Sequence, residues 1–430
     1  MSDTMTAAAR LERLFDNGVF TLLDARVEAG VTTAFGEAAG SPCYAFVQTG
    51  EAVTETQGAK IRRVFQLAMK TGAPVVGMYD SKGAKLSEGQ AVLNAFGDLL
   101  LEANRLSGMV PQISVIMGTC GGCAALLAQT ADLTIMGPAG ELFVTPPFNL
   151  GKTAAFSGSA SNAKAGAVQI TVGSEEEGID AARKALSLLP SNNLSAAPHC
   201  EFSEPELTED LLASAVDPGS ELELYEAFGQ AATTALASIG GVPCGVAGVK
   251  GALNRESCVK LARFVRLCDA FSLPVVTLVD SEGFEASSEA EATGAVREAA
   301  MLTNAYGEAT TAKISVVTGK AVGPVYVALA GRGANADCVF AIEGSVISPL
   351  PTAAAVSVLF DERIAAGEDR AALEAEYDAT IASAAAAAEA GVVDDVIVPQ
   401  DLRARLIAAM EMLSGKRVST VAKKHSNMPL

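Results

Sequence analysis

Tryptophan is absent from this 430-residue sequence, and histidine occurs only twice, as His199 and His425. Histidine is the commonest general base in enzymes and a frequent metal ligand. Neither residue lies in a motif, so each is better explained as a surface or packing residue than as a catalyst.

Basic residues are also few, with 31 Lys and Arg against 50 Asp and Glu and a formal net charge of −19. A charge of this sign repels nucleic acid and anionic membranes. We therefore exclude nucleic acid as a partner. If the substrate carries phosphate groups, the cations that bind them must be local.

The eight cysteines form no disulfide framework, which is typical of reduced thiols in a cytoplasm. Cys120 and Cys123 make one CxxC without a second pair at metal-site spacing, so we interpret them as turn residues and expect no metal. The N-terminus lacks the apolar run of a signal peptide. The uncharged run 106–131 contains proline and four glycines, which favours a buried strand, turn and helix over a membrane span.

Residues 109–132 are the stretch around which the chain is organised. They predict a buried strand at 113–117, a turn with Gly118, Gly121 and Gly122, and a helix at 124–129. Such a turn leaves the first helical N–H groups unpaired, and glycine lets a substrate oxygen approach them, which is the geometry of an oxyanion hole. The alternative is a tight strand-to-helix connection in an α/β core.

The order of elements repeats after about 200 residues. Residues 59–71, 73–80 and 90–105 predict a helix, a strand and a helix around the loop 80–89, and residues 361–420 look mostly helical. The repeat is carried by matched pairs: Pro74 and Pro274, Asp80 and Asp280, Gly83 and Gly283, Ile113 and Ile314, Gly118 and Gly319, Gly122 and Gly323, Asp132 and Asp337. Two α/β domains follow, 1–212 and 213–430, with turn formers clustered between residues 190 and 221.

The motifs along the chain resemble those of a known family. These are RLERLFDNGVFTLLD (10–24), KTGAPVVGMYDSKGAKLSEG (70–89), PQISVIMGTCGGCA (111–124), KLARFVRLCDAFSLPVVTLVDSEGF (260–284), KISVVTGKAVGPVY (313–326) and KKHSNMPL (423–430). The family comprises the carboxyltransferase subunits of biotin-dependent acyl-CoA carboxylases and of sodium-pumping acyl-CoA decarboxylases. The resemblance covers nearly the whole chain and implies two tandem crotonase-like (ClpP/crotonase) domains.

The resemblance also implies a chemistry that needs no protein base. In the family, carboxybiotin releases carbon dioxide, the ureido anion takes the α-proton of the acyl-CoA, and the thioester enolate attacks carbon dioxide; decarboxylases run these steps in reverse. Two backbone oxyanion sites suffice. We interpret Asp80 and Asp280 as turn formers at strand ends rather than as an acid–base pair.

The family's site residues can be carried over by position. The acyl-CoA side corresponds to Gly121, Gly122 and Cys123 with Gly83 and Ala84, and the biotin side to Gly323, Pro324, Val325 and Tyr326 with Gly283 and Phe284. Lys82 and Lys85 are candidates for the CoA phosphates, although solvated loop lysines are the simpler reading.

Several positions depart from the family pattern. Cys123 and Pro324 stand where the family has glycine, and Lys82 and Lys85 replace glycine and arginine. The FGGS segment is missing between Gly50 and Val53, and the GGA-x-x-H segment has no clear match in 145–169. In the family, Asp often follows the tyrosine of the second turn, whereas Val327 follows Tyr326 here. The sequence therefore does not identify the acyl group.

Two further hypotheses stay open. One is a crotonase-type enzyme that acts on acyl-CoA without biotin, using Glu88 and Glu141; the other is a non-catalytic scaffold of a carboxylase complex. For the leading hypothesis we expect biotin on a separate carrier protein, partner biotin carboxylase or membrane decarboxylase subunits, and a homo-oligomer, a dimer or a hexamer. We expect the chain in the cytoplasm, with any membrane association made through its partner subunits.

Overall fold

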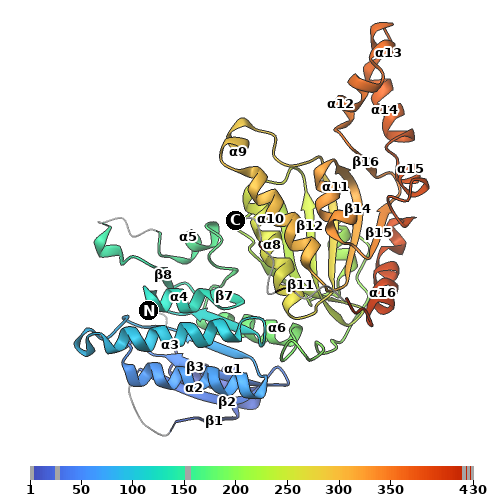
Figure 1. Ribbon diagram of the computed structural model, residues 1–430. Coiled ribbons are helices and arrows are strands. Elements are labelled where there is room, and N and C mark those ends of the chain that lie inside the picture. The colour runs from blue at the N-terminus through green and yellow to red at the C-terminus, as the bar shows by residue number, and fades with distance from the viewer. Residues whose placement is uncertain (1–3, 25–29, 151–155, 419–422, 424–426, 428–430) are drawn as a thin grey trace. The chain divides into compact units, whose positions relative to one another are not determined.

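The computed structural model describes residues 4–24, 30–150, 156–418, 423 and 427. The chain divides into two compact units, one made of residues 1–198 and 224–228 and the other of residues 199–223 and 229–430. Each unit is a mixed α/β structure, as expected (Figure 1). The domain limits 1–212 and 213–430 stay a prediction.

The first unit is built on a seven-stranded sheet of order β1-β2-β3-β4-β5-β7-β9. Strands β1 to β3 pair antiparallel, and β3 to β9 pair parallel. Its strands are β1 Phe20–Leu22, β2 Val31–Ala38, β3 Ser41–Gln48, β4 Val75–Tyr79, β5 Gln112–Ile116, β6 Thr119–Gly121, β7 Leu133–Met136, β8 Glu141–Phe143 and β9 Ile170–Thr171. Its helices are α1 Ala7–Leu14, α2 Glu55–Thr71, α3 Ala91–Leu106, α4 Cys123–Gln129, α5 Ser159–Lys164 and α6 Glu175–Leu188.

The second unit repeats this order in an eight-stranded sheet, β10-β11-β12-β13-β14-β15-β17, with β16 paired to β14. Its strands are β10 Leu222–Leu224, β11 Ala232–Ile239, β12 Val242–Lys250, β13 Val275–Ser281, β14 Lys313–Val322, β15 Cys338–Ile342, β16 Val346–Ser348 and β17 Asp395–Ile397. Its helices are α7 Leu211–Ala215, α8 Arg255–Ala270, α9 Ser288–Ala292, α10 Ala295–Glu308, α11 Pro324–Leu329, α12 Thr352–Leu359, α13 Asp361–Ala365, α14 Arg370–Thr380, α15 Ala384–Glu389 and α16 Leu402–Leu413.

Local sequence signals account for the ends of helix α2. Thr54 and Gln57 form a capping box, and Gly72 ends the helix in a left-handed conformation with φ 66°. The capping box lies before the predicted start at residue 59, so the helix begins four residues earlier. The described part of segment 361–420 is mostly helical, as expected, and it also contributes the short strand β17, which pairs with β15.

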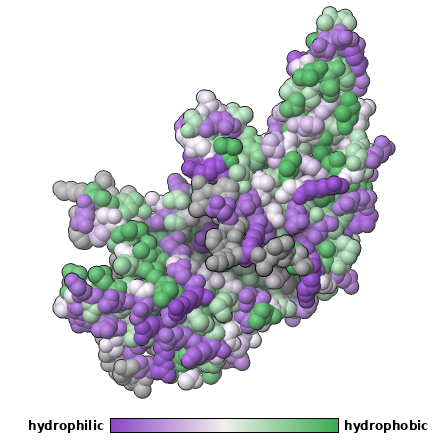
Figure 2. All heavy atoms as spheres, in the orientation of Figure 1, coloured by the Kyte–Doolittle hydropathy of each residue, from purple (hydrophilic) through white to green (hydrophobic). Residues whose placement is uncertain are grey.

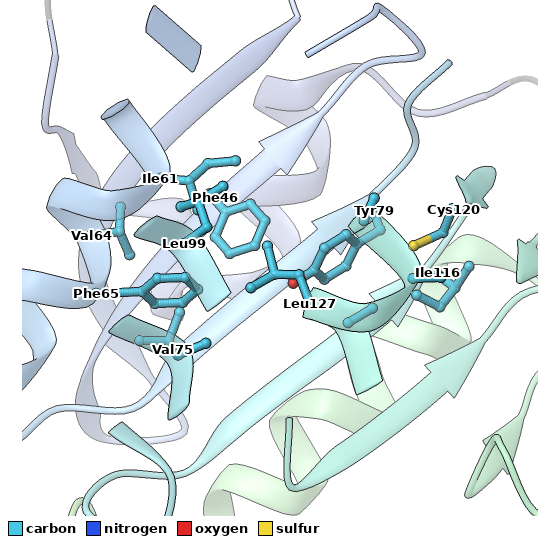
Figure 3. Packing of buried hydrophobic residues seen from close by; sticks show 14 of the residues in the cluster. Phe46, Ile61, Val64, Phe65, Val75, Tyr79, Leu99, Ile116, Cys120 and Leu127 are labelled. Atoms are coloured by element: carbon cyan, nitrogen blue, oxygen red, sulfur yellow. The ribbon is translucent and has the colours of Figure 1, made fainter. Parts of the chain in front are cut away.

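The core of the first unit is formed by side chains from β3, β4, α2 and α3 (Figure 3). The ring of Phe46 meets Phe65 and Tyr79 edge to face, with centroid distances of 6.0 and 5.3 Å. A β-carbon on Gly77 would lie 2.4 Å from the Phe46 ring, so the strand must carry glycine there. This packing fixes the carboxyl end of β4, from which the loop 80–89 begins.

Helices α12, α13 and α14 extend away from the sheet of the second unit (Figure 1). Leu373 and Tyr377 pack with Val356 in a small core of their own. Val358 and Leu359 remain 68% and 56% exposed, and hydrophobic residues are visible on the surface of this extension (Figure 2). Among the described residues, no helix is both long enough and apolar enough to cross a membrane.

The two sheets differ at one buried position. The backbone N–H of Gln112 in β5 donates to the carboxylate of Asp132 at 2.8 Å. The backbone N–H of Lys313 in β14 donates to the carboxylate of Asp337, also at 2.8 Å. The amide of Gln112 donates to a helix-end carbonyl at 3.1 Å, whereas the Lys313 ammonium donates to the carbonyls of Tyr306 and Ala309 at the end of α10. Burial lowers the pKa of Lys313 to about 8, and the nearby Lys416 adds to the shift.

Replacing Lys313 by Gln should therefore change how stability depends on pH. Between about pH 8 and about pH 10.5 the unfolded chain holds the Lys313 proton and the folded chain does not, so the contribution of Lys313 to the free energy of unfolding rises with pH in this window. In Lys313→Gln this contribution should be absent, so the free energy of unfolding of the variant relative to that of the wild type should fall with pH across the window. Urea unfolding at several pH values checks it, with the exposed Lys70→Gln as control; an unchanged pH dependence in Lys313→Gln would contradict the assignment.

Candidate functional site

The loop after β4 is held by backbone hydrogen bonds on both sides of Ala84. The Ser81 hydroxyl accepts the N–H of Gly83 at 3.1 Å. Val53 donates to the Gly83 carbonyl at 2.7 Å and accepts from Lys85 at 2.9 Å. Among the described residues, the N–H of Ala84 in the middle of this loop has no acceptor, which makes it the donor that the loop presents.

The turn between β5 and α4 is held by a short parallel pairing. Strand β6 pairs with β8, and this ladder continues with the N–H of Gly122 donating to the Phe143 carbonyl at 2.9 Å. Gly122 has φ 59° and ψ −124°, a conformation that only glycine adopts readily. Helix α4 then begins at Cys123, whose N–H has no acceptor in the described part of the chain.

These contacts revise the expected role of Gly122. Its N–H is used by the ladder and cannot also hold a substrate oxygen, so its contribution is the shape of the turn. At this turn the N–H of Cys123 has no acceptor among the described residues, and it belongs to the first residue of helix α4, where N–H groups stay free to bind an anion. Gly121 has a packing role, because a β-carbon there would lie 2.3 Å from the Phe143 ring.

The loop after β13 has the same pattern in the second unit. The Ser281 hydroxyl accepts the N–H of Gly283 at 3.2 Å. Leu253 donates to the Gly283 carbonyl at 3.0 Å and accepts from Glu285 at 2.8 Å. Within the described residues this leaves the N–H of Phe284 without an acceptor, at the position that corresponds to Ala84.

The turn before α11 repeats the first turn with one change. Strand β14 pairs with β16, and the N–H of Gly323 donates to the Ser348 carbonyl at 2.8 Å. Gly323 has φ 56° and ψ −128°, close to the values of Gly122. Pro324 is the first residue of α11, where Cys123 stands in the other unit, and it has no N–H to offer. The next donor along the helix is Val325.

A cavity of about 830 Å³ opens beside this second turn. Its lining is mostly apolar and includes Phe284, Gly323, Pro324, Tyr326 and Val327. The Tyr326 hydroxyl donates to the Val392 carbonyl at 2.6 Å, and burial raises the pKa of this phenol. The structure thus brings Phe284, Gly323, Pro324 and Tyr326 together around one hydrophobic cavity, whose lining does not include the other two predicted residues, Gly283 and Val325.

The charged candidates of the first half have different surroundings. Lys82 and Lys85 are exposed and form no ion pair with a described residue, which leaves them available to an anion. Glu88 caps α2 by accepting the N–H of Glu55 at 2.7 Å, and Glu141 accepts from the Thr119 hydroxyl at 3.0 Å. Because both carboxylates have structural partners, they do not favour the hypothesis of a crotonase-type enzyme that acts without biotin.

Cys120 and Cys123, the two residues of the CxxC, both lie at the turn before α4. Cys120 is buried and burial raises the pKa of its thiol, which agrees with a turn residue. No group of three or more potential metal ligands occurs among the described residues. His425 and part of the segment expected to correspond to GGA-x-x-H, residues 151–155, lie outside the described residues.

The aspartates at the two strand ends are the residues whose contacts sequence reasoning missed. A β-carbon on Gly118 would lie 2.2 Å from Oδ1 of Asp80, and one on Gly319 would lie 2.2 Å from Oδ1 of Asp280. Burial raises the pKa of the Asp80 carboxyl, and the Arg10 guanidinium opposes the shift. The only sequence signal was the similar spacing of the two Asp and Gly pairs in the repeat, 38 residues from Asp80 to Gly118 and 39 from Asp280 to Gly319.

Comparison with known proteins identifies related chains. Residues 5–428 match the family model described as carboxyl transferase domain. The chain is 34% identical to the alpha subunit of methylmalonyl-CoA decarboxylase from Propionigenium modestum, covering 100% of this chain and 94% of that protein. It is 33% identical to the propionyl-CoA carboxylase beta chain of Saccharopolyspora erythraea, covering 99% and 90%.

A solved structure agrees with this assignment. The structure of transcarboxylase 12S with hydrolysed methylmalonyl-coenzyme A bound, described as a hexamer, matches with a TM-score of 0.93 and 31% identity over 99% of this chain and 93% of that chain. The match to the decarboxylase subunit spans 485 positions, more than the 430 residues of this chain. The relative therefore contains segments within the matched region that this chain lacks.

Proposed function

The chain belongs to the carboxyl transferase domain family, and on that premise we propose that it moves a carboxyl group between an acyl-CoA and biotin bound to a separate carrier protein. It is an enzyme of the biotin-dependent carboxyltransferase and decarboxylase class. The observation that carries the finer proposal is the pair of turns, each of which presents backbone N–H donors at the end of a parallel strand.

In the first half, the N–H groups of Ala84 and Cys123 would hold the thioester oxygen of the acyl-CoA. When the α-carbon loses its carboxyl group or proton, negative charge develops on this oxygen. Two fixed donors stabilise the charge without reorganisation. Lys82 and Lys85, exposed on the same loop, would meet the CoA phosphates, and Gly83 and Gly122 give the chain the conformations that leave room for the substrate.

In the second half, the N–H groups of Phe284 and Val325 would hold the biotin carbonyl oxygen. Biotin supplies the ureido nitrogen that carries the carboxyl group. The hydrophobic cavity beside α11 fits its bicyclic ring and chain, since about 830 Å³ lies within the usual range for small-molecule sites. Tyr326, Gly323 and Gly283 shape this side, and Pro324 contributes contact without a donor.

We propose that the two units are tandem crotonase-like domains, with residues 1–212 on the acyl-CoA side and 213–430 on the biotin side. Their common strand order and their matching turns support this division. The acyl-CoA is methylmalonyl-CoA or a related short acyl-CoA in this proposal, because methylmalonyl-CoA and propionyl-CoA occur in the names of the relatives.

We also propose that the chain forms a homo-oligomer in which the N-terminal half of one copy faces the C-terminal half of another. The hexamer described for transcarboxylase 12S supports a homo-oligomer, and the exposed apolar side chains of Val358 and Leu359 on α12 are surface that a contact between copies would cover. A biotin carboxyl carrier protein, and a biotin carboxylase or membrane decarboxylase subunit, would complete the working complex in the cytoplasm.

The proposed reaction can be tested with the purified protein. Malonyl-, methylmalonyl- and glutaconyl-CoA should each be offered with free biotin and with a biotinyl carrier protein, and release of carbon dioxide measured. We expect decarboxylation of at least one substrate that depends on biotin. Release of carbon dioxide in the absence of biotin would favour a biotin-independent enzyme. The absence of turnover under every condition would overturn the proposal.

Gly122→Val should abolish acyl-CoA turnover while the protein stays folded. The β-branched side chain would project into open space at the turn, where the substrate oxygen is expected, and would strain a backbone with φ 59°. Because the side chain would keep the substrate oxygen away from the free donors, we expect a loss at least as large as the about 10²–10³ that follows the loss of one oxyanion donor.

Gly40→Val is the matched control for this variant. Gly40 also has a positive φ, 76°, and open space around it, but lies in the turn between β2 and β3. It should lose some stability and keep its turnover. Near-normal turnover in Gly122→Val, or an equal loss in both variants, would place the oxygen site elsewhere.

Pro324→Gly should raise the rate with free biotin. The substitution restores an N–H at the first position of α11, where Cys123 provides one in the other half. We expect a gain of roughly ten-fold, with less effect when a carrier protein positions the biotin. Pro399→Gly, at the first position of a 3-10 helix outside the cavity, is the control. If the free-biotin rate stays the same or falls while folding and acyl-CoA binding are intact, this turn does not hold biotin as proposed.

A further inference from the structure

Each half contains an aspartate that presses against a glycine of the neighbouring turn. Oδ1 of Asp80 occupies the space that a β-carbon of Gly118 would need, and Oδ1 of Asp280 occupies that of Gly319, each at 2.2 Å. In the second half the same Oδ1 accepts the backbone N–H of Lys320 at 2.9 Å. In the first half the backbone N–H of Thr119, the corresponding residue, faces the Asp80 carboxylate.

The backbones around these aspartates are joined as well. The carbonyl of Asp80 accepts the N–H of Gly50 at 2.8 Å, and the carbonyl of Asp280 accepts that of Gly251 at 2.9 Å. Ser81 then donates its N–H to the Thr119 carbonyl at 2.8 Å. Each aspartate therefore lies where three segments meet: the end of one strand, its own loop, and the start of the next turn.

This meeting point lies a few residues before both proposed donors of each half. Ala84 follows Asp80 by four residues, and Cys123 follows Thr119 by four residues. In the second half Phe284 follows Asp280 by four residues, and Val325 follows Lys320 by five, because Pro324 takes the position that corresponds to Cys123. Because the loop and the turn are otherwise separate pieces of chain, the distance between their N–H groups depends on how they are tied together here.

We propose that Asp80 and Asp280 are positioning residues that set the spacing of the two oxyanion donors in their own halves, through a lock between a carboxylate and a turn glycine. The proposal rests on the proposed function. Gly118 and Gly319 complete the locks, since any side chain at either position would push the carboxylate away. Each lock should act on its own half of the reaction and leave the other half unchanged.

The lock explains why these aspartates are not free to serve as general bases. The Asp80 carboxylate is turned onto the backbone of Gly118 and Thr119, and that of Asp280 onto Gly319 and Lys320. A base must instead reach the proton of a bound substrate. An asparagine at either position can still accept the backbone N–H, but it cannot act as a base. Replacement by asparagine therefore distinguishes a positioning role from a role as general base.

A double-mutant cycle tests the lock in the first half. Asp80→Ala and Gly118→Ala should each lower kcat by about 10²-fold, the size of loss that a donor displaced by about 1 Å produces, while the dissociation constant of acyl-CoA changes by less than about three-fold. The double variant should be no worse than either single variant, because both remove the same contact. Asp80→Asn should recover most of the rate.

Asp280→Ala, Gly319→Ala and their double variant form the matched set for the second half. They should lower the rate with biotin and leave acyl-CoA binding unchanged. Losses that add in the double variants, or a near-normal rate in Asp80→Ala, would overturn the lock. An Asp80→Asn variant as slow as Asp80→Ala, with its turn unaltered, would show a chemical role instead.

Amide hydrogen exchange gives a readout that does not need activity. Asp80→Ala and Gly118→Ala should speed exchange in segments 82–89 and 119–126 and leave segments 282–287 and 320–327 unchanged; Asp280→Ala should do the reverse. Unchanged exchange would overturn the lock even in an active enzyme. If the wild type proves inactive with every substrate but exchange responds as expected, the proposed function fails and the structural lock stands.

Discussion

The pairing of backbone N–H groups at two glycine turns is the constraint on which the site depends. At each turn two short parallel strands pair, β6 with β8 or β14 with β16. The N–H of the turn glycine donates to a carbonyl of the second strand, and a helix begins at the next residue. The first N–H groups of that helix then have no acceptor in the described part of the chain. A donor stays free here because the N–H of the preceding glycine is already bonded, and the strand pairing that bonds it also holds the turn in place.

The sequence predicted the parts of this arrangement that are local. The strand, the glycine turn and the helix around 109–132 are where the pattern placed them, within one residue at each boundary. The family resemblance and the mixed α/β class are confirmed by the comparisons. These predictions succeed because hydrophobic runs, glycines and helix caps act over a few residues.

What the sequence could not predict depends on distant contacts. The N–H of Gly122 is occupied because it donates to the carbonyl of Phe143, which is 21 residues away in the chain. Gly118 must be glycine because the side chain of Asp80 packs against it. The strand β17 lies in a segment whose own composition favours helix, and its pairing with β15 decides otherwise. In each case the residue's role is set by a partner that its neighbours in the sequence do not reveal.

Because the proposed donors are main-chain groups, replacing a side chain cannot delete them. An alanine scan would leave the N–H of Cys123, Phe284 or Val325 in place and would report the catalytic centre as tolerant to mutation. This also lets the side chains at such positions diverge, as Cys123 and Pro324 have done between two otherwise matching turns. Proline is the one amino acid that removes a main-chain donor, so in this architecture a single codon change at a helix start acts on the chemistry directly.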